Sequence, residues 1–92
     1  MEFEWDAREA ARNLRKHKVS FMEAATVFGD FLSTTAPDPA HSLDEHRYIT
    51  VGFSNVGRLL MVAHAERGDH IRIISARTLT ASERRAYEDK DE

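Results

Sequence analysis

Cysteine and long apolar runs are both absent from this sequence. Without a cysteine among its 92 residues, the chain forms neither disulfides nor thiolate metal sites. No apolar stretch approaches the roughly 20 residues that a membrane-spanning helix needs. Residues 1–6 lack the basic and then apolar layout of a signal peptide. These absences together predict a cytoplasmic protein that does not engage a membrane.

The composition is that of one folded domain, which we expect to span residues 1–92. The chain is 41% apolar and 32% charged, a balance that permits a core and is unlike that of a disordered chain. Area scaling suggests that folding buries roughly 64% of the unfolded surface of such a chain. The core is therefore modest in size.

Positive charge is concentrated in one part of the chain. Residues 1–46 carry five Lys or Arg against nine Asp or Glu, whereas residues 47–87 carry seven arginines, no lysine and three acids. Arginine is suited to bidentate contacts with phosphate. A chain with a net charge of −3 can therefore still present an anion-binding surface. Charge alone does not separate such a surface from an ordinary solvated one.

A β-branched run after the turn signal Gly68-Asp69 predicts a central strand over residues 70–77. Strict alternation would divide its side chains between two faces, with Ile71, Ile73 and Ser75 on one and Arg72, Ile74 and Ala76 on the other. An arginine among isoleucines is costly to bury unless it meets an anion or lies in a cleft. We therefore look for chemistry at Arg72, and at Arg77 where the strand ends.

The rest of the pattern predicts an α+β fold in which a meander of antiparallel strands carries two N-terminal helices on one face. The expected elements are a strand at 2–5, helices at 6–17 and 20–28, a short strand at 31–35, a loop at 36–45, strands at 46–53 and 58–65, and a lightly packed helix at 80–87. We expect the two N-terminal helices to cover a shared set of apolar side chains, namely Phe3, Trp5, Ile49, Val51, Phe53, Ile71 and Ile73.

The loop that follows the short strand contains potential metal ligands, Asp38, His41, Asp44 and His46. No helix or strand fixes their spacing, and coincidences of this kind are common. We therefore predict neither a metal site nor any other cofactor.

Short motifs along nearly the whole chain resemble the BrnT family of type II toxins. They are Trp5-Asp6, Asn13, Lys16-His17, Phe21-x-Glu23-Ala24, the run from Arg72 to Arg77, and Glu83-Arg84-x-x-Tyr87. The chain departs from the family at Lys18, where members usually have glycine, and at Phe31, where they often have proline. Glycine at the first position would suit a left-handed helix cap, so the end of the first helix is in question.

The resemblance implies a RelE-like fold and a ribonuclease that inhibits translation by cutting RNA. It also implies neutralisation by a BrnA-like antitoxin, which binds operator DNA and brings the toxin to it. A different class of function is a non-enzymatic interaction module, or co-repressor subunit, whose arginines bind an acidic partner.

RNA cleavage without a metal uses the neighbouring 2′-hydroxyl as nucleophile, and it needs cations and proton-transfer groups at the phosphate. Arg72 and Arg77 are the predicted phosphate binders, with His64 as base or acid and Tyr87 as proton donor or stacking group. His64 has a second interpretation as a packed histidine, and Tyr87 as a residue that seals the last helix.

Four further side chains are predicted to bind RNA, namely Arg47, Lys16, His17 and Arg84. The alternative for Lys16 and His17 is a favourable interaction with the dipole at the end of the first helix.

Overall fold

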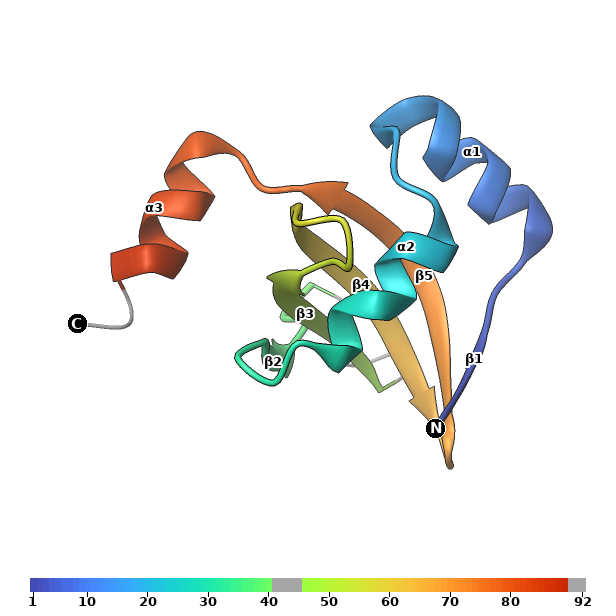
Figure 1. Ribbon diagram of the computed structural model, residues 1–92. Coiled ribbons are helices and arrows are strands. Elements are labelled where there is room, and N and C mark those ends of the chain that lie inside the picture. Colours follow the sequence, from blue (N-terminus) through green and yellow to red (C-terminus); the bar gives the residue numbers. More distant parts are fainter. Residues whose placement is uncertain (41–45, 90–92) are drawn as a thin grey trace.

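One strand and two helices precede a run of four strands and a last helix along residues 1–40 and 46–89, which are the residues that the computed structural model describes (Figure 1). The elements are β1 (Glu2–Glu4), α1 (Ala7–His17), α2 (Phe21–Thr26), the 3₁₀ turn η1 (Val27–Gly29), β2 (Thr34–Pro37), β3 (Arg47–Phe53), β4 (Leu59–Arg67), β5 (His70–Thr78) and α3 (Ala81–Asp89). The strands form one sheet in the order β1-β5-β4-β3-β2, antiparallel throughout except that β1 runs parallel to β5. The predicted α+β class is confirmed. Within the described residues, no helix is both long and apolar enough to cross a membrane.

Helix α1 begins and ends where its sequence signals place it. The Asp6 carboxylate accepts hydrogen bonds from the backbone N–H groups of Arg8 (2.8 Å) and Glu9 (3.0 Å), which satisfies two free donors of the first turn. Lys18 closes the helix in the left-handed conformation, at φ 60°, and its N–H donates to the Leu14 carbonyl. Lysine thus adopts the cap geometry that suits glycine, at a cost of up to about 1 kcal/mol.

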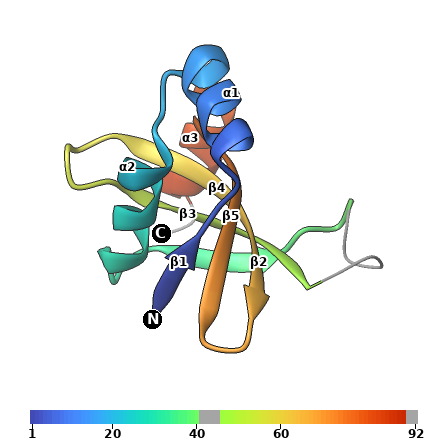
Figure 2. The ribbon, with the colours of Figure 1, turned by 90° about the vertical axis from the view of Figure 1, so that its right-hand side faces the viewer.

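The segment that contains α2 buries one face of the sheet, and Figure 2 shows α2 to one side of the strands and α1 above the end of β5. The core consists of Val19, Phe21, Ala24 and Val27 from the helical segment packed on Leu60, Val62, Ile73 and Ala76 from the central strands. Phe3 and Trp5 pack against this cluster, as predicted. Both α1 and α2 contact β5, so β5 is the strand against which the two helices pack.

The prediction for β3 was wrong, because the other face of this strand is turned toward the helices. Thr50, not Ile49 or Val51, is fully buried on the covered face, and Phe53 is 42% exposed. Gly52 explains the choice of face: a Cβ there would lie 2.7 Å from the Cβ of Ser33 and 3.1 Å from Val27 Cγ1. The close approach of η1 therefore requires a residue without a side chain on this face.

The predicted alternation of β5 was also wrong beyond Ile73, because the strand contains an irregularity. Ala63 pairs with Ser75 and His64 pairs with Ile73, which leaves Ile74 without a partner on β4. Such an extra residue shifts the pleat by one position. Ala76 therefore joins Ile71 and Ile73 in the core, whereas Ser75 faces away from it.

Segment ends around β2 differ from the prediction as well. The second helix does not continue regularly to residue 28 but tightens into η1 after Thr26. The short strand lies at Thr34–Pro37, not at 31–35, because the Asp30 carboxylate accepts from the N–H groups of Leu32 (3.0 Å) and Phe53 (2.9 Å) and so holds a turn there. Helix α3 buries none of its residues, which confirms the expected light packing.

Candidate functional site

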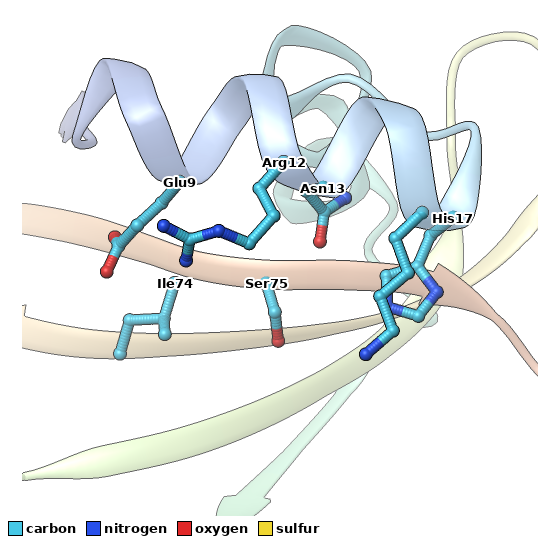
Figure 3. A pocket seen from close by; sticks show the side chains of 7 residues that line it. Glu9, Arg12, Asn13, His17, Ile74 and Ser75 are labelled. Atoms are coloured by element: carbon cyan, nitrogen blue, oxygen red, sulfur yellow. The ribbon is translucent and has the colours of Figure 1, made fainter.

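Helix α1 and strand β5 enclose a cleft of about 230 Å³ that is rich in cationic side chains (Figure 3). Its lining residues are Glu9, Arg12, Asn13, Lys16, His17, Ile74 and Ser75. Residues three and four apart share a helix face, which is why one helix contributes so many of them. The cleft brings Lys16 and His17 together as predicted RNA-binding residues. Arg12, Asn13 and Ser75 were not predicted, although the i, i+4 spacing of Arg12 and Lys16 was a usable signal.

Arg72 lies on β5 two residues before Ile74, but it is not among the residues that line the cleft. It is half-buried, and its guanidinium contacts the Glu4 carboxylate at 3.5 Å. The pKa of Asp6 is lowered, first by the backbone N–H donors of Glu9 and Arg8 and further by the positive charges of Arg72 and Arg12. Two guanidinium groups, one from β5 and one from α1, therefore act on the same carboxylate at the start of the helix.

Arg77 has a structural partner. Its guanidinium donates to both carboxylate oxygens of Glu83, at 2.7 and 2.9 Å, and to the Thr78 carbonyl at 3.2 Å. This contact, together with the Thr80 backbone N–H, lowers the pKa of Glu83 to about 2. The pair joins the end of β5 to the first turn of α3. We therefore leave Arg77 out of the candidate site.

His64 is buried in the core and does not lie on the arginine-bearing face. It is 1% exposed, its Nε2 lies 2.8 Å from Thr50 Oγ1, and its ring packs edge-on against Phe28 and parallel to Tyr48. Burial lowers its pKa from 6.5 to about 4. The interpretation of His64 as a packed histidine fits these contacts, whereas a catalytic role requires access to substrate.

The remaining predicted residues do not line the cleft. Arg47 pairs across β3–β4 with Ala65, which pairs with Arg72, so both arginines share one face two strands apart. Tyr87 donates to the Leu32 carbonyl at 3.3 Å and borders a separate hollow over β2 and β3. Arg84 is exposed and contacts Glu88 at 3.4 Å. None of the described residues that line the cleft comes from α3.

The loop residues do not form a recognisable metal centre where the structure describes them. The Asp38 carboxylate accepts from the backbone N–H of Ala40 at 3.0 Å, which is a turn contact. His41 and Asp44 lie outside the described residues. Within residues 1–40 and 46–89, no group of three or more His, Asp or Glu side chains is placed to hold a metal ion.

Comparison with known proteins now identifies the family. Residues 5–83 match the family model described as "Ribonuclease toxin, BrnT, of type II toxin-antitoxin system". The chain belongs to the BrnT family. A solved structure, the ribonuclease toxin BrnT of Brucella abortus, is 26% identical with a TM-score of 0.69, and the match covers 87% of this chain and 97% of that one. No curated protein matches in sequence.

Membership in the BrnT family establishes this chain as a ribonuclease toxin of a type II toxin–antitoxin system. Such a system implies an RNA substrate and an antitoxin partner. The cationic cleft between α1 and β5 lies within the matched residues. It is therefore the first place to seek the ribonuclease chemistry of this BrnT-family chain.

The buried state of His64 predicts an acid-sensitive fold. Below pH 6.5 an unfolded chain takes up a proton at this histidine, whereas the folded chain resists protonation until about pH 4. Stability therefore falls as the pH drops through this window, by on the order of 3 kcal/mol. Urea unfolding across this range measures it. His64→Gln, which does not titrate, should flatten the dependence; an equally steep dependence in this variant would contradict the assignment.

Proposed function

We propose that this chain cuts RNA without a metal ion at the α1–β5 cleft, with the neighbouring 2′-hydroxyl of the RNA as nucleophile. The observation that carries the proposal is the cleft lining, in which Arg12, Lys16 and His17 of α1 face the Ser75 hydroxyl of β5. Arg72 of the same strand adds a guanidinium whose charge acts, with that of Arg12, on Asp6 at the start of α1. A cleft of this charge suits a polyanion. Cutting RNA in this way would inhibit translation.

The proposed reaction assigns different tasks to these groups. As the 2′-oxygen attacks, negative charge accumulates on the phosphate oxygens, and the guanidinium groups of Arg72 and Arg12 stabilise that charge. Lys16 adds a mobile ammonium donor. The imidazole of His17 exchanges the proton that leaves the 2′-hydroxyl or joins the departing 5′-oxygen. Ser75 orients the phosphate through its hydroxyl.

The face that carries Arg72 extends the RNA-binding surface beyond the cleft. Arg47 and Arg72 stand two strands apart in one row, so their backbones are separated by about 10 Å. This separation allows the two arginines to contact different phosphates of one strand. Arg47 is therefore assigned to binding rather than to chemistry.

The proposed partner is a BrnA-like antitoxin that neutralises the toxin and links it to operator DNA. The toxin itself has an acidic segment, residues 88–92, and a net charge of −3, which do not favour direct binding to DNA. The competing function, a non-enzymatic module whose arginines bind an acidic protein, makes a different prediction for Arg72.

Replacing Arg72 and Arg77 separates a ligand-binding arginine from a structural one. Arg72→Ala should lower the single-turnover cleavage rate by about 10²–10³-fold with little change in melting temperature, and Arg72→Lys should retain part of the activity. Arg77→Ala should lower the melting temperature or the helix content, because α3 loses its link to β5. Cleavage by Arg72→Ala at the wild-type rate, with loss of antitoxin binding instead, would favour the interaction module.

Metal-independent cleavage predicts insensitivity to chelation. Purified toxin assayed in EDTA on a single-stranded RNA should retain its rate and leave 2′,3′-cyclic phosphate ends, because the attacking oxygen belongs to the substrate. An RNA with 2′-O-methyl groups is the control and should resist cutting. Activity that disappears in EDTA and returns with Mg²⁺ would show that the proposed chemistry is wrong.

A further inference from the structure

Asn13 is a polar side chain buried between α1 and β5, with its amide engaged at both ends. It is 6% exposed. Its Nδ2 donates to the carbonyls of Val19 at 2.9 Å and Ala76 at 2.8 Å, and its Oδ1 accepts from the Ala76 N–H at 3.0 Å. These contacts use both donor hydrogens of the amide and its acceptor oxygen. The Asn13 side chain therefore joins α1 to the segment before α2 at Val19 and to β5 at Ala76.

The Asn13 amide takes the place of a neighbouring strand. Strand β1 accompanies β5 only as far as Glu4, which pairs with Arg72. At Ala76 the amide offers the one donor and one acceptor that a paired strand would offer. Because unpaired backbone groups are costly to bury, this contact holds α1 at a fixed height along β5.

We infer that Asn13 is the positioning residue of the cleft, because it sets the cations of α1 against the functional side chains of β5. The inference rests on the proposed function, which gives those cations their task. Arg12 precedes Asn13, and Lys16 and His17 follow it by three and four residues on the adjoining helix face. Figure 3 shows Arg12 and His17 on either side of Asn13 along the helix. On the other side, Ser75 precedes the bonded Ala76. The side-chain amide of Asn13 thus fixes the relative position of α1 and β5, the two elements that line the cleft.

Only asparagine meets the three contacts at this position. An aspartate would place carboxylate oxygens against the carbonyls of Val19 and Ala76, and it would lose both donors. Alanine would leave those carbonyls and the Ala76 N–H unpaired. Glutamine has the same amide, but its extra methylene pushes α1 away from the strand. Small displacements matter in a catalytic site, where about 1 Å can cost roughly 10²-fold in rate.

A double-mutant cycle distinguishes positioning from simple stabilisation. The variants are Asn13→Ala, Lys16→Ala and their combination, with Thr50→Val as a matched control that also loses buried hydrogen bonds but lies outside the cleft. Single-turnover cleavage of an end-labelled single-stranded RNA is measured per folded molecule, with the folded fraction taken from circular dichroism. Asn13→Ser replaces Asn13→Ala if the latter does not fold.

We expect Asn13→Ala to lower the maximal rate by about 10²-fold, with a much smaller change in the half-saturating RNA concentration. Thr50→Val should cut at the wild-type rate per folded molecule. In the double variant, Asn13→Ala should lower the rate by a smaller factor than it does alone, because the Lys16 side chain that Asn13 positions is absent. Equal losses for Asn13→Ala and Thr50→Val, full activity of Asn13→Ala, or independent effects in the cycle would each overturn the inference.

A failure of the proposed function would give a different set of results from a failure of the inference about Asn13. If Lys16→Ala and Arg72→Ala both cut RNA at the wild-type rate, the cleft is not the catalytic site, and the role of Asn13 is refuted with it. If those two variants lose activity while Asn13→Ala does not, the proposed function stands and only the inference about Asn13 is wrong.

Discussion

The hydrogen bonds of the Asn13 amide are the contact on which the arrangement of α1 and β5 depends. Two carbonyls and one N–H of the backbone are satisfied by one buried side chain. A donor or acceptor left unpaired in such a place costs about 1–3 kcal/mol, so the helix has little freedom to shift along the strand. The position of the cationic cleft follows from this restraint, because its lining side chains come from these two elements.

The arginines of the chain differ in how closely they are paired, which composition does not reveal. Arg58 donates to both oxygens of Glu23 and to the carbonyl of Lys18, and it thereby ties the turn before β4 to α2 and to the end of α1. Arg77 joins β5 to α3 through Glu83. Arg72, by contrast, makes a longer contact of 3.5 Å, with Glu4. The excess of arginine in residues 47–87 therefore reflects the scaffold as much as any ligand.

Local signals in the sequence were sufficient for the elements and insufficient for their faces. Asp6 and Ser20 cap the predicted helices, and the meander appears as expected, because both depend on neighbouring residues. Which face of β3 is covered depends on the distant approach of η1 to Gly52. The shift in β5 at Ile74 is likewise set by pairing with β4. Alternation along β4 puts His64 on the face of Leu60 and Val62, which are both fully buried, but its contacts with Phe28 and Thr50 form only in the folded chain.

The candidate site shows the same division. Lys16 and His17 were predicted to bind RNA from the sequence and both line the cleft, whereas Asn13 and Ser75 gain their significance only when α1 meets β5. The most direct test of the α1–β5 cleft as the RNA site is amide chemical-shift mapping with a 2′-O-methyl RNA that cannot be cut. The account predicts the largest shifts at Arg12, Lys16, His17 and Ser75. The largest shifts over β2 and α3, with the cleft unaffected, would contradict it.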